Sequence, residues 1–195
     1  MTSNNKVPRV PSRSWNDLEG IGLAIRQRVA VESLKEPSSI DLASLFEADL
    51  KWLLGYEYQI KHLPSDVEAM TLCKSKQIIL SHETYDSLGD ESSSGYGRAR
   101  FTVAHEICHI AVHAKYLRES TSLRGESSGI RLNRSFLKPY EDPEIQANAF
   151  AARFLMPTFQ VEMLLREGAT INEIAEVFGV SYEAACYRVN SMKKK

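Results

Sequence analysis

One predicted helix constrains the fold of this chain more than any other segment. From about Arg98 to Leu117 the sequence contains no proline or glycine, and apolar residues occur around most of the helical circumference. A helix with this pattern is expected to lie in the core of a globular domain. The same segment contains the run His105-Glu106-Ile107-Cys108-His109. Titratable side chains in a buried helix carry a desolvation cost, which a bound cation would offset.

The spacing of the two histidines predicts a metal site. His105 and His109 are four residues apart and therefore lie one above the other on one face of the helix. Two imidazoles in this arrangement can hold one divalent ion, and the HExxH pattern is typical of zinc peptidases. Metals lower the pKa of water bound to them, and Glu106 is the predicted general base that takes a proton from that water.

Two other interpretations remain open for the histidine pair. The imidazoles can be core groups bonded to backbone carbonyls, or they can belong to a structural metal site, which normally has four protein ligands. The pair His82-Glu83 has no histidine four residues further on and is interpreted as surface.

A catalytic zinc site needs a third protein ligand. His113 continues the histidine stripe, but three residues at successive i+4 positions span about 12 Å along a helix and do not converge on one ion. We therefore expect the ligand to come from a second helix, predicted from Glu144 to about Met156, with Glu144 as the best candidate. An acidic residue in the first turn of a helix is also favourable without a metal.

Asn148 lies one helical turn beyond Glu144 and is predicted to accept the N–H of a ligating imidazole. Glu141 and Asp142 are competing ligands, although both precede Pro143 and are expected to lie outside the helix.

Composition and charge exclude several classes of protein. The chain has 24 Lys and Arg against 25 Asp and Glu, so no overall field attracts it to nucleic acid or to anionic membrane. The N-terminus has no apolar signal-peptide core and no apolar run is long enough to span a bilayer, so we expect a soluble, cytoplasmic protein without membrane contact. Cys73, Cys108 and Cys186 are widely spaced and are interpreted as free thiols.

The expected organisation is an α+β domain with flanking segments. Residues 1–14 are polar and are predicted to form a flexible N-terminal arm. Strands are predicted for Trp52–Ile60 and Gln77–Ser81. A metallopeptidase domain is expected over residues 15–157 and a helical subdomain over residues 158–195.

Two motifs together resemble the ImmA/IrrE family of metallopeptidases: RARFTVAHEICHIAVH from Arg98 and EIQANAFAARFLMP from Glu144. The resemblance implies a zincin-like α+β fold with a small antiparallel sheet, active-site helices and a helix-turn-helix-like C-terminal part. It also implies His105, His109 and Glu144 as ligands of zinc, or of another divalent metal such as Mn²⁺, with Glu106 as the general base. Cys108 departs from the glycine that the family often has there, and it is interpreted as a small core residue.

Members of the family that this chain resembles cleave helix-turn-helix repressors. The resemblance therefore implies an endopeptidase that derepresses stress or mobile-element genes. Alternatives are a metalloprotease-fold toxin partnered by an antitoxin, a DNA-binding regulator with a non-catalytic metal site, and a structural metal protein that unfolds on chelation. Candidate oxyanion stabilisers are Tyr140, Tyr116 and His113, and the strand around Ile78–Leu80 is expected to pair with an extended substrate.

The C-terminal segment is predicted to form helix, turn and helix. Thr170 and Glu173 form a capping box, Gly179 makes the turn and Ser181 caps the last helix. A DNA reader would use Tyr182, Arg188 and the terminal lysines, but residues 170–195 contain three Glu against one Arg and three Lys. We therefore favour a role in packing or protein contact over DNA binding.

Overall fold

The computed structural model describes residues 10–121 and 139–193. The α-helices are α1 (Trp15–Val29), α2 (Leu42–Ser44), α3 (Leu50–Leu54), α4 (His82–Leu88), α5 (Tyr96–Cys108), α6 (Ala114–Thr121), α7 (Pro143–Leu155), α8 (Thr158–Arg166), α9 (Ile171–Phe178) and α10 (Tyr182–Met192). The strands are β1 (Glu57–Lys61), β2 (Ala69–Leu72) and β3 (Gln77–Ser81). Short 3₁₀ turns occupy Val31–Leu34 and Pro139–Glu141, and π-helical turns occupy Leu45–Asp49 and His109–His113.

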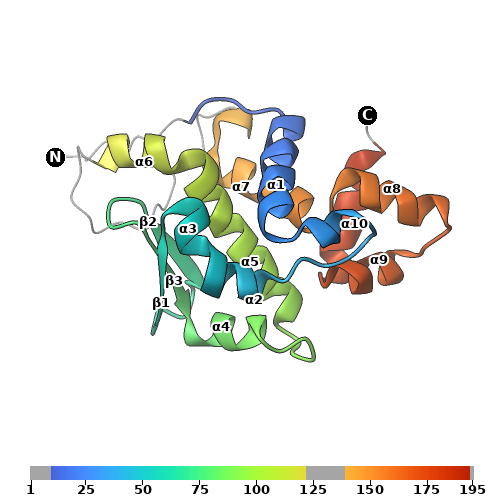
Figure 1. Ribbon diagram of the computed structural model, residues 1–195, viewed down its shortest axis with the longest axis horizontal. Coiled ribbons are helices and arrows are strands. Elements are labelled where there is room, and N and C mark those ends of the chain that lie inside the picture. Colours follow the sequence, from blue (N-terminus) through green and yellow to red (C-terminus); the bar gives the residue numbers. More distant parts are fainter. Residues whose placement is uncertain (1–9, 122–138, 194–195) are drawn as a thin grey trace.

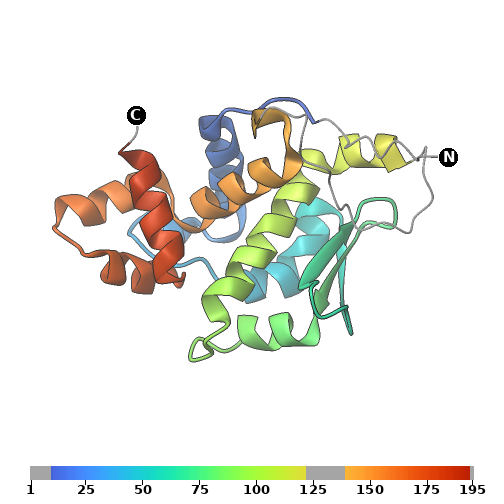
Figure 2. The same ribbon diagram turned by 180° about the vertical axis from the view of Figure 1, so that it is seen from behind.

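The sheet and the C-terminal helices lie at opposite ends of the molecule, and α5 runs between them (Figures 1 and 2). The predicted central helix is confirmed: α5 continues through the π-helical turn His109–His113 into α6. The α+β class is confirmed as well, since a small sheet accompanies the helices. Within the described ranges, no helix combines the length and apolar character needed to cross a bilayer.

The sheet is mixed, which corrects the expectation of an antiparallel sheet. Its strand order is β1-β3-β2, with β3 antiparallel to β2 and parallel to β1. The physical reason is the connection of residues 62–68, which carries the chain from β1 to the opposite edge of the sheet. β2 and β3 then form a hairpin, and β3 fills the centre, running in the same direction as β1.

The strand predicted for Trp52–Ile60 is wrong in its first half. Residues 50–54 form helix α3, and the strand begins only at Glu57. Gly55 ends the helix with a left-handed backbone, φ +72°, a conformation that glycine adopts without a side-chain clash. The aromatic content of this stretch favoured a strand, but the helix end at Gly55 limits the strand to the residues beyond it.

The N-terminal arm is packed in the part that the structure describes. Residues 1–9 of the predicted arm lie outside the described residues, whereas Val10 is buried and the Pro11 carbonyl accepts a hydrogen bond from Gln146. Ser14 caps α1 and forms a capping box with Asp17. Val10, Pro11 and Ser14 therefore contact the folded domain, and the flexibility expected of residues 1–14 stays a prediction.

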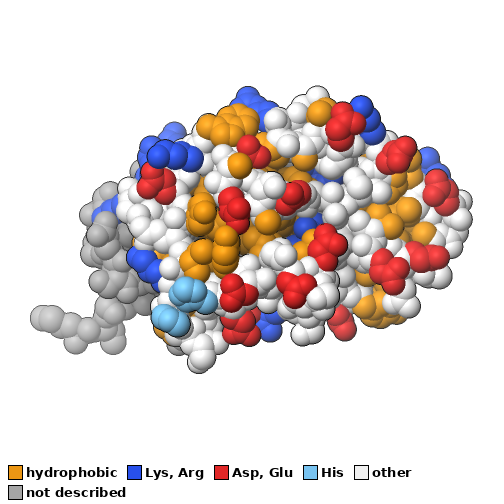
Figure 3. Space-filling view, turned by 60° about the horizontal axis from the view of Figure 1, so that its bottom comes forward, with side chains coloured by type: hydrophobic (Ala, Val, Ile, Leu, Met, Phe, Trp, Pro, Cys, Tyr) orange, Lys and Arg blue, Asp and Glu red, His pale blue; other side chains and the backbone are white. Residues whose placement is uncertain are grey.

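The C-terminal helices have the caps that the sequence predicted. Thr170 and Glu173 form the capping box of α9, Gly179 ends α9 with φ +60°, and Ser181 caps α10. Acidic side chains are spread over the end of the molecule that carries these helices, and the face in Figure 3 shows no continuous basic patch. Arg188, which the less favoured DNA-reader interpretation places at phosphates, is 1% exposed and donates to the Met156 carbonyl. Its position agrees with a role in packing.

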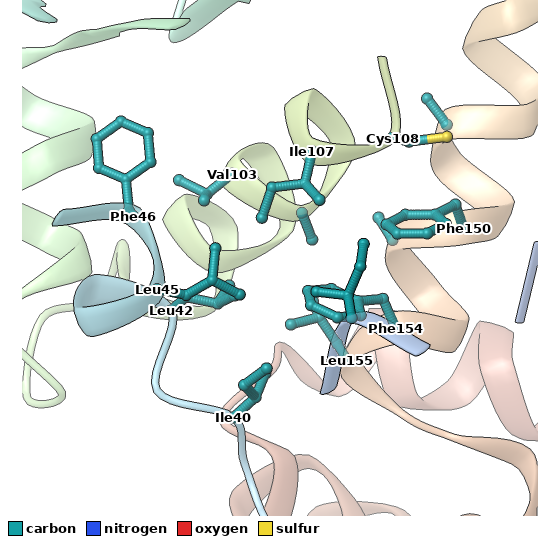
Figure 4. Close-up of a cluster of buried hydrophobic side chains, with 14 of the residues drawn as sticks. Ile40, Leu42, Leu45, Phe46, Val103, Ile107, Cys108, Phe150, Phe154 and Leu155 are labelled. Atoms are coloured by element: carbon teal, nitrogen blue, oxygen red, sulfur yellow. The ribbon is translucent and has the colours of Figure 1, made fainter. Parts of the chain in front are cut away.

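The part of the core drawn in Figure 4 lies between α5, α7 and the segment from Ile40 to Phe46, which includes α2. Ile107 and Cys108 of α5 lie among buried side chains that include Phe150 and Phe154 of α7. Arg26 of α1 donates to the carbonyls of Phe154 and Leu155 at the C-terminal end of α7. These bonds satisfy carbonyls that a helix end leaves without an intrahelical partner. Helix α7, which carries Glu144, is thereby bonded to α1.

Candidate metal centre

Three side chains from two helices converge at one point. His105 Nε2 lies 3.3 Å from Glu144 Oε2, and His109 Nε2 lies 3.4 Å from Glu144 Oε1. The two Nε2 atoms are 3.0 Å apart. In the part of the chain that the structure describes, these residues form the one group of at least three His, Cys, Asp or Glu side chains suited to a metal ion.

The geometry of this group fits a divalent cation. Zinc ligands at 2.0–2.1 Å in a tetrahedron lie about 3.3 Å from one another, close to the three separations above. Two imidazole nitrogens and a carboxylate are also the donor types that zinc takes in catalytic sites. A carboxylate facing two imidazole lone pairs is repulsive unless a proton or a cation lies between them. The donor set therefore supports a metal, in the arrangement that the sequence predicted.

Helix α7 presents Glu144 through a well-defined N-terminus. Asp142 is the N-cap and accepts hydrogen bonds from the backbone of Glu144 and Ile145, and Pro143 is the first helical residue. Asp142 is thus occupied by capping, and Glu141 belongs to the preceding 3₁₀ turn. Both competing ligands lie outside α7, as expected. Burial raises the pKa of Glu144, but the hydrogen bond with His105 and the neighbouring imidazoles outweigh it and lower that pKa overall.

Each histidine of this group has a hydrogen-bond partner on its other ring nitrogen. Asn148, one turn after Glu144, places Oδ1 2.9 Å from His105 Nδ1. His109 Nδ1 lies 3.1 Å from Nδ1 of His113. Burial lowers the pKa of His109 to about 3 and that of His113 to about 4, so both rings are neutral at physiological pH.

Glu106 lies beside the ligand group and against the sheet. Its Oε2 accepts a 2.5 Å hydrogen bond from the hydroxyl of Thr71 on β2. The carboxylate is buried, and this burial raises its pKa, while His105 and the Thr71 hydrogen bond oppose the rise. A raised carboxyl pKa brings a general base closer to the pH at which it must exchange a proton.

A cleft of about 760 Å³ opens onto Glu106 and the three ligands. It is bounded by β2 with its flanking residues and by α5, and is closed by Leu117, Glu144 and Asn148. Its charged and polar residues include Glu68, Arg98 and Thr102. Arg98 forms an ion pair with Glu68, and the Thr102 hydroxyl donates a 2.7 Å hydrogen bond to the same carboxylate. A cleft of this size accommodates a short peptide segment or a small ligand.

The cleft lies along β2 and not along β3. The sequence-based expectation that Ile78–Leu80 pairs with a substrate is wrong, because β3 is the central strand and both of its edges are already paired. β2 is an outer strand, and its residues 69–72 line the cleft. The sequence did not indicate β2, which is four residues long and half-buried.

The three candidate oxyanion stabilisers are absent from the described lining of the cleft. His113 is fully buried behind His109, with its ring nitrogens next to His109 and Gln146. Tyr116 lies on α6, beyond the π-helical turn, and Tyr140 lies in the 3₁₀ turn before α7. Leu117 of α6 does line the cleft, whereas Tyr116, about 100° away around the same helix, does not. Nothing in the sequence indicated Thr71 or Gln146, the further residues that contact this site.

Comparisons with known proteins agree with this reading. The family model described as Peptidase_M78, IrrE N-terminal-like domain, matches residues 91–190. A solved structure described as a Mycobacterium tuberculosis transcriptional regulator superposes with a TM-score of 0.58 at 16% sequence identity. The match covers 89% of this chain and 46% of that one, so the chain spans less than half of that protein, and the likeness concerns the fold alone. A search of curated proteins found no match.

Proposed function

The chain belongs to the peptidase M78 family with its IrrE N-terminal-like domain, and we propose from this membership that it is a metal-dependent endopeptidase. The observation that carries the proposal is the convergence of His105, His109 and Glu144 at a cleft that also contains Glu106. Three protein ligands beside an open cleft are typical of a catalytic site, whereas structural zinc sites are closed by four. This favours an enzyme over a structural metal protein.

Zinc is the metal that we propose, with Mn²⁺ as the alternative. A divalent ion held by the three ligands would polarise a peptide carbonyl and lower the pKa of a coordinated water. Glu106 accepts a proton from the attacking water and donates it to the leaving amine. Thr71 holds Oε2 of that carboxylate by its hydroxyl, and Asn148 holds the ring of His105 by Nδ1.

We further propose that an extended segment of a protein substrate pairs with β2. An outer strand presents backbone N–H and C=O groups that a peptide can pair with, as in strand addition. Paired in this way, the peptide would run along the cleft past Glu106 and the ligands. The substrate class that we propose is a helix-turn-helix repressor in the cytoplasm, whose cleavage derepresses stress or mobile-element genes.

The test is cleavage of a helix-turn-helix repressor chosen from the genome that encodes this chain. The two purified proteins are incubated with zinc, with manganese or with a chelator, and products are identified by mass spectrometry. We expect metal-dependent cleavage at one site in the partner, abolished in Glu106→Gln and retained in Glu83→Gln. Glu83 is a matched control because it follows His82, is exposed on α4 and is not part of the lining of the cleft.

The outcomes separate the proposal from its alternatives. Binding of the partner without cleavage, unchanged in Glu106→Gln, would favour a regulator with a non-catalytic metal site. Growth arrest that requires the metal ligands when the chain is expressed, and that is relieved by co-expression of a candidate antitoxin, would favour a toxin and its antitoxin.

A further inference from the structure

A third histidine, His113, lies directly behind His109 of the proposed metal site. His113 is fully buried on the π-helical turn, with Nδ1 3.1 Å from His109 Nδ1 and Nε2 3.1 Å from Gln146 Oε1. Gln146 is on α7, two residues after Glu144, and is also fully buried. The ligand is therefore connected through His113 to the helix that supplies the third ligand.

The amide of Gln146, at the other end of this connection, has a defined orientation. Gln146 Nε2 lies 2.9 Å from the Pro11 carbonyl and 2.8 Å from the Tyr140 carbonyl. Carbonyl oxygens only accept, so the amide nitrogen must face both of them. Oε1 of Gln146 is consequently the acceptor that faces His113.

The orientation of Gln146 then determines which ring nitrogen carries the proton in His113 and in His109. Since Gln146 Oε1 accepts, His113 Nε2 carries the proton, and a neutral imidazole has its lone pair on the other nitrogen. His113 Nδ1 therefore accepts, and His109 Nδ1 donates to it. The lone pair of His109 is left on Nε2, the atom that faces His105 and Glu144.

We propose that His113 and Gln146 are positioning residues that select the tautomer and ring orientation with which His109 binds its metal. The proposal rests on the metal site of the proposed function and adds to it the buried residues that prepare one ligand. His105 has a shorter connection, a single bond to Asn148. The His109 connection instead ends on the backbone of two other segments, at Pro11, which is 135 residues from Gln146 in the sequence, and at Tyr140, which is six residues from it.

The first experiment measures the zinc dissociation constant of purified full-length protein by competition with a chelating dye. Loss of a partner that orients a ligand typically weakens metal binding about 10- to 100-fold. We expect a rise in this range for His113→Leu and about tenfold for Gln146→Met. His113→Gln keeps one acceptor and one donor at similar reach, and should stay within about threefold of the wild type.

Gln160→Met is the matched control. Gln160 is fully buried on α8 and its Nε2 donates to two backbone carbonyls, those of Ser33 and Glu36, at 2.7 Å each. Its loss removes the same kind of bond without touching the ligand group, so zinc affinity should change by less than about twofold. The control separates loss of stability from loss of ligand positioning.

A spectroscopic measurement on the wild type completes the test. In ¹⁵N-histidine spectra of the zinc-loaded protein, we expect His113 to be neutral with its proton on Nε2, and His109 to carry its proton on Nδ1. A proton on His113 Nδ1 would overturn the proposal even if the His113 variants fail to fold. Zinc affinity unchanged in folded His113→Leu, or equally reduced in His113→Gln, would overturn it too. A wild type that binds no zinc would instead refute the metal site on which the proposal rests.

Discussion

Thr71 on the outer strand donates a 2.5 Å hydrogen bond to the carboxylate of Glu106 on the central helix. The two residues are 35 positions apart, and the strand that carries Thr71 forms one wall of the cleft. The bond therefore links the general base of the proposed reaction to the strand on which we place the substrate. Hydrogen bonds to charged groups contribute about 1.5–3 kcal/mol, enough to hold a carboxylate in one orientation.

We expect Thr71→Val to lower the turnover rate about tenfold or more while leaving zinc binding unchanged, because valine keeps the shape but cannot hold Glu106. Single-turnover cleavage and metal content together measure this. Thr102→Val is the control: the Thr102 hydroxyl lies in the same cleft but bonds Glu68. Equal losses in both variants would mean that Thr71 contributes only to the shape of the cleft.

Glu106→Gln should reduce cleavage about 10²–10⁴-fold, the usual effect of removing a positioned base. The amide keeps the volume of the side chain and leaves His105, His109 and Glu144 in place, so metal and partner binding should persist. The comparison is single-turnover cleavage at equal metal occupancy. Rates within about threefold of the wild type would end the proposed mechanism, since the general-base range is far larger.

The ligand group should hold about one divalent ion per chain. We expect His105→Ala combined with His109→Ala to abolish this binding, because only Glu144 of the group remains. Elemental analysis after reconstitution and desalting gives the stoichiometry. His62→Ala combined with His82→Ala is the control, since these two histidines are exposed and their tilted rings lie with centroids 4.6 Å apart. Equal metal content in both double variants would contradict the assignment.

Gly97→Ala should destabilise the protein by about 1–3 kcal/mol, the usual range for an overpacked site. A Cβ at Gly97 on α5 would lie 2.8 Å from the backbone nitrogen of Ser181, in the turn between α9 and α10. Gly20→Ala is the opposite control: Gly20 is exposed within α1 and a Cβ there meets nothing within 4 Å. We expect that change to stabilise the protein by about 0.5–1 kcal/mol. Denaturant unfolding gives the free energy of unfolding of both variants. A Gly97→Ala variant as stable as the wild type would show that the C-terminal turn does not depend on this close approach.

We expect the C-terminal helices to show no sequence-specific DNA binding at physiological salt. Arg188 is buried in packing, and the three Glu of residues 170–195 offset most of the basic charge. Phosphate neutralisation normally requires a basic surface. A gel-shift titration with the promoter of the protein's own gene, against a scrambled duplex, is the measurement. Nanomolar binding that favours the promoter and persists in Glu106→Gln would contradict this expectation.

Local patterns determined much of the candidate site. The four-residue spacings of His105 with His109 and of Glu144 with Asn148 place each pair on one helix face, because helix geometry depends only on neighbouring residues. The caps at Asp142 with Pro143 and at Thr170 with Glu173 are local in the same sense. The tertiary structure places His105 and His109 of one helix next to Glu144 of the other, as the sequence led us to expect.

Contacts between distant segments were decided by the tertiary structure alone. Which strand is central depends on how the chain crosses the sheet after β1, so the sequence led to Ile78–Leu80 where the cleft presents β2. Thr71 meets Glu106, and Gln146 meets His113, only after the sheet and α7 have packed on α5 and its continuation. A hydrogen bond of this kind has no sequence period, because its partners are brought together by packing in three dimensions and not by their spacing along the chain.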